Sequence, residues 1–567
     1  MRSQNGIALV VALGLLLVMS VLAVGVFFTT QLELWTTRND TTSVQAFYAA
    51  EAGVQKYKAA LFNQYIWQEQ ALSGPTPAST ACFSSFAKGI DWNRNGRIDP
   101  GEDFAGGRMT LARDEPVYDA DGNPVGYATV ELYPSNNPKT YTLVSYGTAG
   151  GAKARVQATF FIETSSPLNL AIFAGSGAAN KWLNGGATIR GGIYVEGDPN
   201  NPDGQVISAN GNFALYNEYD LTQYPGLADF ISPANQKAED LCATLRVRWG
   251  QVSVGGSTQI GTPQNKLKGV YVGRGRSDIQ GQNVDVCQSN KGVCTEALGP
   301  FDLSDPPSFP TLDGPGGCGG SLSWRDCLRR EASLRVTRGA PIIDIIGWPL
   351  GAIPSNPQSC IQAFAGKTLT LGNSAVDCSY TLPTGERGGF KYTPGSPGTL
   401  EVYGTVVLEG YDVVLSGDLR YRAQTGSTKN AGLAVLSVFA PRSNAQGGQG
   451  GSLEIGGTLL PDPSLGRFPE QVLGLVVEKD VYQKGSRVTA PIYAGGTFRI
   501  VHKNTLVGSV ITNQFCTTSA GGQTNCNAGQ SAEIVFVNTT GNRPQALKAI
   551  DQLAGRFTFQ VLSYERR

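Results

Sequence analysis

The sequence predicts an α+β fold in which a long N-terminal helix and a small antiparallel sheet carry a large inserted all-β domain, a β-solenoid. Three observations support this fold. The first 72 residues follow a helical pattern that begins in an apolar run. Short apolar runs separated by Gly, Asn and Asp turns fill most of the remaining chain. The last residues return to a helix followed by a strand.

The composition is typical of a turn-rich β protein. The chain has 567 residues, with 72 Gly, 31 Pro and 16% charged residues, and its length predicts two or more domains. Its formal net charge is zero. Nothing global therefore requires a nucleic acid as partner, and any polyanion site must be a local patch.

The N-terminal apolar run is long enough to cross a membrane. Residues 7–28 carry no charge, which gives about 33 Å of helix. This length exceeds an ordinary signal-peptide core, and no small-residue cleavage site follows. Further along, apolar residues at steps of three, four or seven share one helical face: Val44, Phe47, Val54, Tyr57 and Leu61. The helix is therefore expected to leave the membrane with an amphipathic stripe.

Gly6 directly precedes this run and is the last residue of a leader of six residues. Together with the stretches ALVVALGLLLVMSVLAVG and AFYAAEAG, this resembles the N-terminal region of PilX-like type IV minor pilins. The resemblance implies cleavage after Gly6 by a prepilin peptidase and N-methylation of Ile7. It also implies insertion in the inner membrane before assembly, and association with other major and minor pilins through the helix. The alternative is a plain signal anchor with a coincidental glycine.

Val11 departs from the pilin pattern. Major pilins of this family carry Glu as the fifth mature residue, where it offsets the terminal amine of the neighbouring subunit ahead, since an unpaired charge in an apolar setting is costly. A subunit with no neighbour ahead has no such partner. Val11 therefore predicts a position at the tip of a surface pilus, or in its initiation. The alternative is a minor pilin that tolerates the loss.

The head is expected to be a small antiparallel sheet on the helix. The stretches MTLARDEPVYDADGNPVGYATVELYP and TYTLVSYGTAGGAKARVQATFFIET have the pattern of hairpins, and DADGN at 119–123 is better explained as a turn than as a metal loop. At the C-terminus, a helix with Leu547, Ile550 and Ala554 on one face precedes the strand RFTFQVLSY. This strand completes the head sheet if the solenoid is an insertion, or else it caps the solenoid.

The central region has the pattern of stacked coils. Seven apolar runs, from GGIYVEG to APIYAGGTFRIV, predict short strands. Nearly 380 residues at roughly 20 to 25 per coil would give about fifteen coils and about 70 Å of rod. A β-sandwich or a β-propeller is the competing architecture. The expected domains are 1–6 (leader), 7–28 and 29–72 (helix halves), 80–166 (head), 167–541 (solenoid) and 542–567 (return to the head).

The segment DWNRNGRIDPGE fits the calcium-loop pattern D-x-[DN]-x-[DN]-G-x5-E in every specified position. Gly96 allows the sharp turn and Ile98 can pack inward. Pro100 and the β-like flanks argue against paired EF-hand helices, so we expect a lone structural calcium site. A metal-free turn is the alternative. The predicted ligands are Asp91, Asn93, Asn95, the Arg97 carbonyl, Asp99 and Glu102.

Ten cysteines in a chain expected to be exported predict disulfides. Four close couples suggest themselves, and the remaining two cysteines would form a long-range bond, although the sequence does not prove this connectivity. The suggested pairs are Cys287 with Cys294, Cys318 with Cys327, Cys360 with Cys378, Cys516 with Cys526, and Cys82 with Cys242.

A basic stretch free of acidic residues lies between Asp240 and Asp278. Alternate residues on a strand point the same way, so stacked strands could build a face that follows phosphates without reading sequence. Ordinary solvated faces are the alternative. The predicted DNA-binding residues are Arg246, Arg248, Trp249, Lys266, Lys268, Tyr271, Arg274 and Arg276. A second basic cluster, diluted by acids, comprises Arg325, Arg329, Arg330, Arg335 and Arg338.

Enzyme chemistry finds little support, and we expect no catalysis. His502 is the single histidine, which removes Ser-His and Cys-His mechanisms unless His502 itself serves. Some β-solenoids are polysaccharide lyases or hydrolases, but a fold does not establish an activity. Carboxylates that could pair in such chemistry are Glu401, Glu409, Asp412 and Asp418.

A minor pilin of this size with a β-solenoid head resembles the competence-associated minor pilins. This resemblance implies capture of extracellular double-stranded DNA for uptake, independent of sequence. Two other functions stay open: a tip adhesin that binds surfaces or glycans, and a priming subunit that binds no ligand of its own.

Overall fold

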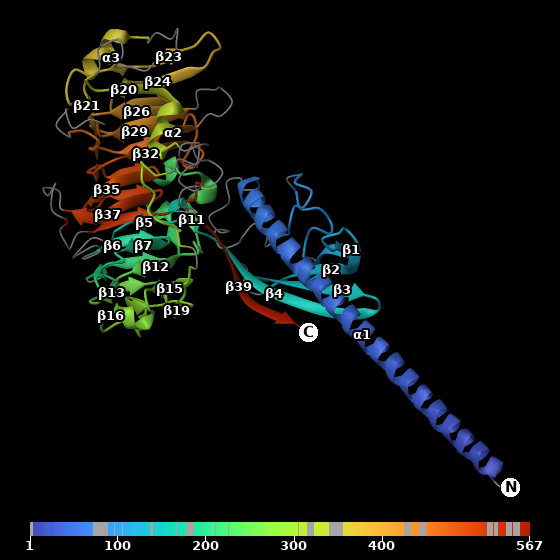
Figure 1. Cartoon of the computed structure of the whole chain (residues 1–567). Helices are drawn as coiled ribbons and strands as arrows, with labels where there is room; N and C mark the ends of the chain where they lie inside the picture. Colours follow the sequence, from blue (N-terminus) through green and yellow to red (C-terminus); the bar gives the residue numbers. More distant parts are fainter. Residues whose placement is uncertain are drawn as a thin grey trace. The chain divides into compact units, whose positions relative to one another are not determined.

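The N-terminal helix is one continuous element in the computed structural model (Figure 1). Helix α1 spans Gln4–Ala71, 68 residues, as the sequence predicted. Between Leu9 and Phe28 its large apolar side chains are more than half exposed, so this stretch needs lipid or other apolar helices around it. By length and composition, the helix could cross a membrane.

The structure describes most of the chain. The described residues are 4–71, 89–95, 97–104, 106–135, 140–165, 167–176, 186–209, 211–224, 226–303, 306–314, 322–339, 355–424, 432–441, 449–518, 526, 531–539, 547 and 556–566.

The head sheet has five strands, and the C-terminus contributes one of them. Strands β1 to β4 pair antiparallel in succession, and β39 lies beside β4. The chain between β4 and β39 is therefore an insertion into the head, and the C-terminal strand does not cap the solenoid. The strands are β1 (Met109–Tyr118), β2 (Pro124–Pro134), β3 (Thr140–Ala149), β4 (Ala152–Ser165) and β39 (Arg556–Arg566).

The helix predicted just before β39 lies outside the described residues, apart from Leu547. The side chain of Leu547 is buried and packs in the β unit described below.

Small residues bring α1 against the head sheet. The buried face of α1 includes Ala46, Ala50 and Val54, whereas Val44, which the periodicity placed on this face, is 51% exposed. A Cβ atom on Gly147 would lie 2.0 Å from the carbonyl oxygen of Ala46, so only glycine permits this approach. A periodicity of large apolar residues did not reveal this contact because small residues make it.

The chain folds into two compact units. The head unit holds α1 and the head sheet up to Glu163, and again from Phe559; the β unit runs from Thr164 to Thr558. The predicted start of the inserted domain, residue 167, lies close to the observed start at Thr164. Its predicted end, residue 541, lies before the observed end at Thr558. The difference arises because the helical pattern after residue 541 was assigned to the head.

The β unit is a stack of coils whose strands pair mainly in parallel. Each coil crosses up to three faces, and neighbouring coils extend the sheets on those faces. The antiparallel pairs β17–β18 and β24–β25 lie towards the two extremities of the stack. Because β-sandwiches and β-propellers are built from antiparallel neighbours, this pairing favours the β-solenoid.

The first face carries, in spatial order, β19 (Leu298–Gly299), β15 (Gly269–Val272), β12 (Thr244–Trp249), β7 (Ile193–Gly197), β5 (Ile172–Ala174), β37 (Val510–Thr518), β35 (Ile492–Val501), β32 (Val472–Val477), β29 (Leu433–Phe439), β26 (Thr405–Glu409) and β20 (Ala332–Thr337).

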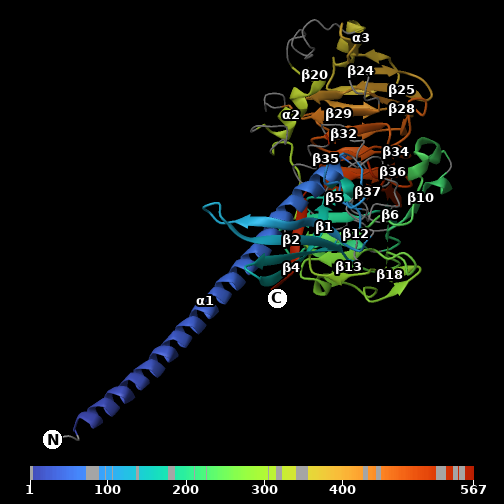
Figure 2. The same cartoon turned by 90° about the vertical axis from the view of Figure 1, so that its right-hand side faces the viewer.

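The second face, several strands of which are labelled on the right of Figure 2, carries β17 (Cys287–Gln288), β18 (Lys291–Val293), β14 (Gln259–Ile260), β9 (Ala214–Tyr216), β6 (Ala187–Arg190), β38 (Ala532–Val535), β36 (Thr505–Val507), β34 (Arg487–Thr489), β31 (Leu459–Pro461), β28 (Leu419–Gln424), β25 (Gly398–Tyr403), β24 (Arg387–Thr393) and β22 (Val376–Asp377).

The third face carries β16 (Ile279–Gln280), β13 (Gln251–Val254) and β8 (Gln205–Ala209) in one half, and β33 (Val481–Gln483), β30 (Leu453–Ile455), β27 (Asp412–Leu415) and β21 (Thr368–Leu371) in the other. Smaller elements outside the three faces are β10 (Tyr219–Asp220), β11 (Lys237–Ala238), β23 (Tyr380–Thr381), α2 (Trp324–Arg330) and α3 (Pro357–Ala363).

The chain begins the stack in its middle. From β5 it adds coils in one direction as far as β19, crosses to the opposite extremity at β20, and adds coils back to β37. There β37 pairs in parallel with β5, with Val510 beside Ile172 and Thr512 beside Ala174. Figure 1 shows this junction as red strands directly beside teal ones. The first and last coils of the β unit are therefore neighbours.

The stack is shorter than predicted. Within the described ranges, eleven strands follow one another along the first face, which corresponds to about 50 Å rather than 70 Å. The expectation of fifteen coils was wrong because it counted every residue of the region. The described residues within 217–241, 300–331 and 338–367 add no strand of their own to the first face.

The crossing chain covers the outer side of the first face. We call the described residues within 300–331, which include α2, the crossover segment. The ring of Phe309 lies between Phe173 of β5 and Tyr493 of β35, with centroid distances of 6.4 and 6.0 Å, over the junction of the two halves. The Tyr493 hydroxyl donates to the Pro310 carbonyl at 2.8 Å. The crossover segment thus joins coils that are far apart in sequence.

Candidate functional site

The stacking distributes the predicted DNA-binding residues over β12, β15 and the turns at both ends of these strands. Arg246 lies beside Tyr271 in the parallel register, and its guanidinium carbon is 5.4 Å from the centre of that ring. Lys266 and Lys268 precede β15, whereas Arg274 and Arg276 follow it. The structure therefore divides the predicted site into two corners, with Arg246 and Tyr271 between them.

Arg246 is occupied inside the fold. Its side chain is only 9% exposed, and its guanidinium donates to both carboxylate oxygens of Asp302 at 2.9 and 2.8 Å. Asp302 belongs to the crossover segment. The structure thus gives Arg246 a role in holding that segment, and leaves little of its guanidinium accessible to a phosphate.

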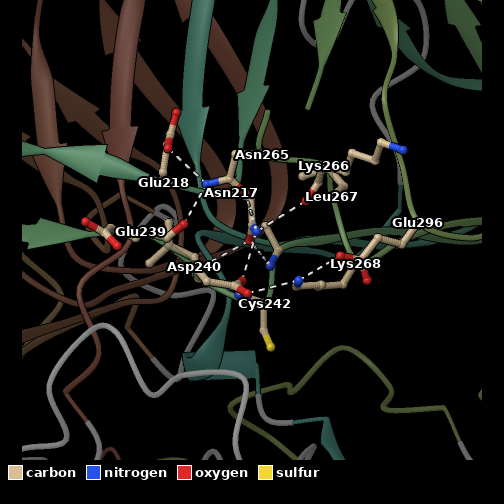
Figure 3. Close-up of polar contacts among 12 residues, drawn as sticks. Asn217, Glu218, Glu239, Asp240, Cys242, Asn265, Lys266, Leu267, Lys268 and Glu296 are labelled. Atoms are coloured by element: carbon tan, nitrogen blue, oxygen red, sulfur yellow. Dashed lines mark hydrogen bonds and ion pairs between the residues drawn. The ribbon is translucent and has the colours of Figure 1, made fainter. Parts of the chain in front are cut away.

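At the first corner, a polar network surrounds Lys268 (Figure 3). The Lys268 amine lies 3.0 Å from Asp240 and 2.8 Å from Glu296. Buried Asn217 donates to Asp240 at 2.9 Å and accepts from the Ala243 backbone N–H, which fixes the turn. Lys266 is exposed, and Figure 3 shows its amine directed away from this network. Lys268 is neutralised locally, whereas Lys266 faces solvent.

At the second corner, each arginine faces a carboxylate. Arg248 lies 3.7 Å from Glu196 and stacks over the Trp249 ring at 5.4 Å. The other contacts are between Arg274 and both Asp203 (2.5 Å) and Asp278 (2.8 Å), and between Arg276 and Asp285 (2.6 Å).

The hydrogen bonds from these arginines stabilise the charged carboxylates. Arg274 holds the pKa of Asp278 below its usual value, and Arg276 does the same for the pKa of Asp285. Both acids therefore stay ionised at neutral pH.

Sequence reasoning missed the acids that face these bases. No acid interrupts the stretch between Asp240 and Asp278, but stacking brings acids in from other coils. Lys268 and Glu296, for example, are 28 residues apart, about one coil. Residues 164–558 contain 31 Lys and Arg against 30 Asp and Glu, so this pairing leaves no large uncompensated field.

The second basic cluster also serves the fold. Arg325 and Arg329 of α2 are each 7% exposed. Arg325 donates to both carboxylate oxygens of Glu478 at 2.6 and 2.7 Å, and Arg329 pairs with Glu409. These pairs attach α2 to the first face of the stack. Arg335 is exposed on β20.

The predicted calcium loop gathers its oxygen-bearing side chains. Asp91 is fully buried. Asp99 accepts from the side-chain amides of Asn93 at 2.8 Å and Asn95 at 2.7 Å. Glu102 accepts from the Trp92 backbone N–H at 2.9 Å, which closes the loop.

Gly96 lies outside the described residues. Among those described, no three acidic, His or Cys side chains converge closely enough to hold a metal by themselves. The side-chain oxygens of Asn93 and Asn95 accept from the backbone N–H groups of Asn95 and Arg97, at 3.0 and 2.8 Å. Asp119 accepts from the Asn123 backbone N–H at 2.8 Å, which is the turn expected for DADGN.

Three of the suggested disulfides are present: Cys287–Cys294, Cys360–Cys378 and Cys516–Cys526. Cys242 and Cys327 are also disulfide-bonded. Their suggested partners, Cys82 and Cys318, lie outside the described residues, so these two pairings stay predictions.

The residues considered for catalysis have structural contacts. The Nδ1 atom of His502 accepts from the Ser531 backbone N–H at 3.2 Å. Glu401 accepts from the Tyr403 hydroxyl, and Glu409 pairs with Arg329. Asp412 and Asp418 accept from backbone N–H groups of neighbouring coils.

The contact between Arg246 and Asp302 leads to a stability prediction. We expect Arg246→Ala to lower the free energy of unfolding by about 3 kcal/mol, because it leaves a partly buried carboxylate without its partner. Urea unfolding of the full-length protein in a neutral detergent measures this. Lys266→Ala, at an exposed position, is the control and should change it by less than about 0.5 kcal/mol. Equal stability of the two variants would contradict the role given to Arg246.

Comparisons with known proteins agree with the fold. The model of the PilX N-terminal family matches residues 5–55. The crystal structure of the competence-associated pilin ComZ from Thermus thermophilus is 55% identical to this chain, with a TM-score of 0.71; the match covers 93% of this chain and 97% of that one. No curated protein matches. The chain belongs to the competence-associated type IV minor pilins.

Proposed function

We propose that this minor pilin stands at the tip of a competence pilus, where its β unit binds extracellular double-stranded DNA for uptake, independent of sequence. The observation that carries this proposal is the likeness to a competence-associated pilin over 93% of the chain, which includes the inserted β unit. A pilin of this family is anchored in the membrane and then becomes part of a surface pilus.

Two features of the chain support the tip position. The β unit, residues 164–558, is far larger than the head sheet that carries it, and an insertion of this size is hard to repeat along a helical shaft. Val11 lacks the carboxylate that would offset the terminal amine of a subunit ahead. Both features suit a subunit that occurs once per pilus and does not repeat along the shaft.

The accessible cations indicate where a phosphate backbone would bind. Arg274 and Arg276 have side-chain exposures of 66% and 44%, and Lys266 is exposed at the other corner. Trp249 and Arg248 lie near the arginine corner and could contact sugar or bases. Because the net charge is near zero, binding should depend on these few contacts, and three phosphate contacts would give a plot of log affinity against log salt with a slope of about −3.

Random-sequence duplex DNA tests this proposal. We expect the full-length protein in neutral detergent to bind duplex DNA, with affinity falling as salt rises. A triple Gln variant of Lys266, Arg274 and Arg276 should bind at least tenfold more weakly. The matched control replaces three exposed cations elsewhere in the β unit: Arg335, Lys367 and Lys503.

The possible outcomes separate the candidate functions. If both triple variants weaken DNA binding equally, the two corners are not part of the DNA interface. Absence of DNA binding by the natural chain would favour the tip adhesin, if glycans bind, or the priming subunit, if pilus number falls when the protein is deleted.

We also propose processing by the prepilin peptidase between Gly6 and Ile7. We expect mass spectrometry of sheared pili to find a peptide that begins with N-methylated Ile7. Replacing Gly6 with Val should leave the leader uncut and keep the protein in the membrane fraction. Gly14→Val, where a Cβ atom meets no neighbour in the chain, is the control for cleavage. A leader still attached to pilus-associated protein would refute this.

Calcium binding by the Asp91 to Glu102 loop is a separate proposal. Carboxylate and amide oxygens are the ligands that calcium prefers, and Glu102 would bind through both oxygens. We expect calcium at a hundred times its dissociation constant to stabilise the unit that unfolds with the loop by about 2.7 kcal/mol.

Isothermal titration calorimetry and thermal unfolding with and without chelator measure calcium binding. Glu102→Gln should abolish the calcium-dependent shift, whereas Asp119→Asn, in the hairpin turn, should not. A chelator-insensitive melting curve with no heat of binding would refute the site.

A further inference from the structure

Two guanidinium groups at the second corner, those of Arg274 and Arg276, each have one contact that is fixed by the fold and one that is exposed. For Arg274 the fixed contact is Asp278, which is 2% exposed and also accepts from the Arg274 backbone N–H at 2.7 Å. The exposed contact is Asp203, which is 65% exposed and lies 2.5 Å from the guanidinium. Asp278 accepts from both Nε and Nη2 of the guanidinium and holds the arginine in place, whereas Asp203 accepts from Nη2 alone.

Arg276 repeats this arrangement two residues later. One of its terminal N–H groups donates to the Ile279 carbonyl at 2.7 Å, inside the coil. Its other N–H groups donate to both carboxylate oxygens of Asp285 at 3.0 and 2.6 Å. Asp285 is 79% exposed. Each of these two neighbouring arginines therefore has one contact within the fold and one with an exposed aspartate.

Asp285 accepts two parallel N–H bonds from Arg276, and it thereby occupies the position that a phosphate oxygen pair takes in a bidentate contact. Asp203 occupies one such donor, Nη2 of Arg274. Ion pairs between exposed groups contribute little, about 0 to 1 kcal/mol. A DNA phosphate can therefore displace such an aspartate, but it must compete with it.

We propose that Asp203 and Asp285 are built-in competitors that occupy the phosphate-binding groups of Arg274 and Arg276 when DNA is absent, and thereby set the affinity for DNA. This inference rests on the proposed function. It predicts that the natural chain binds DNA more weakly than its own arginines allow, and that removing the competing charge tightens binding.

The test compares two double variants of the full-length protein in neutral detergent. Asp203→Asn with Asp285→Asn should tighten binding of a random-sequence duplex about five- to tenfold. The control, Asp229→Asn with Asp418→Asn, removes the same charge from exposed positions elsewhere in the β unit and should change the affinity less than twofold. Fluorescence anisotropy at fixed salt measures the dissociation constants.

A double-mutant cycle makes the test specific. In a background with Arg274→Gln and Arg276→Gln, the Asp203 and Asp285 substitutions should have no more effect than the control pair. Equal tightening in both backgrounds, or no tightening in the natural background, overturns the competitor role while DNA binding stands. If neither the natural chain nor the Asn variant binds duplex DNA, the proposed function itself fails.

Discussion

Parallel hydrogen bonding between β5 and β37 is the contact on which the β unit depends. An insertion into a small sheet must leave and rejoin that sheet, whereas a coil stack built from one end to the other would have its ends far apart. Here the stack begins in the middle, and β37 returns beside β5. The crossover segment makes this order possible, and Phe309 packs over the junction that it creates. The order in which the chain builds the coils therefore also keeps the first and last coils of the insertion together.

The same stacking controls the electrostatics. Stacked coils bring acids beside bases that are remote in sequence, as with Lys268 and Glu296, which are 28 residues apart. Pairs with buried members, such as Arg329 with Glu409, hold structure together, whereas the exposed pairs of Arg274 and Arg276 remain open to exchange. The formal net charge of zero thus conceals two kinds of ion pair, and the exposed kind contributes little to stability.

Much of the fold could be predicted from local pattern. Helix α1, the head hairpins and the seven apolar runs are where periodicity placed them, because a periodic pattern of apolar residues reflects the local backbone conformation. The crossover could not be predicted, because no local sequence pattern indicates that β20 lies at the opposite end of the stack from β19. For the same reason the basic stretch looked uncompensated: the partner of Arg246 is Asp302, on a segment that only the chain path brings close. The contact of Gly147 with α1 escaped because small residues carry no periodic signal.

Starting the stack in its middle also bears on how such a domain could change in length over evolutionary time. Duplication or loss of an internal rung in either arm would move that arm's tip but leave the β5–β37 joint, and hence the tether to the filament, as it is. The length of the β unit and its attachment to the head sheet can then vary separately among related pilins.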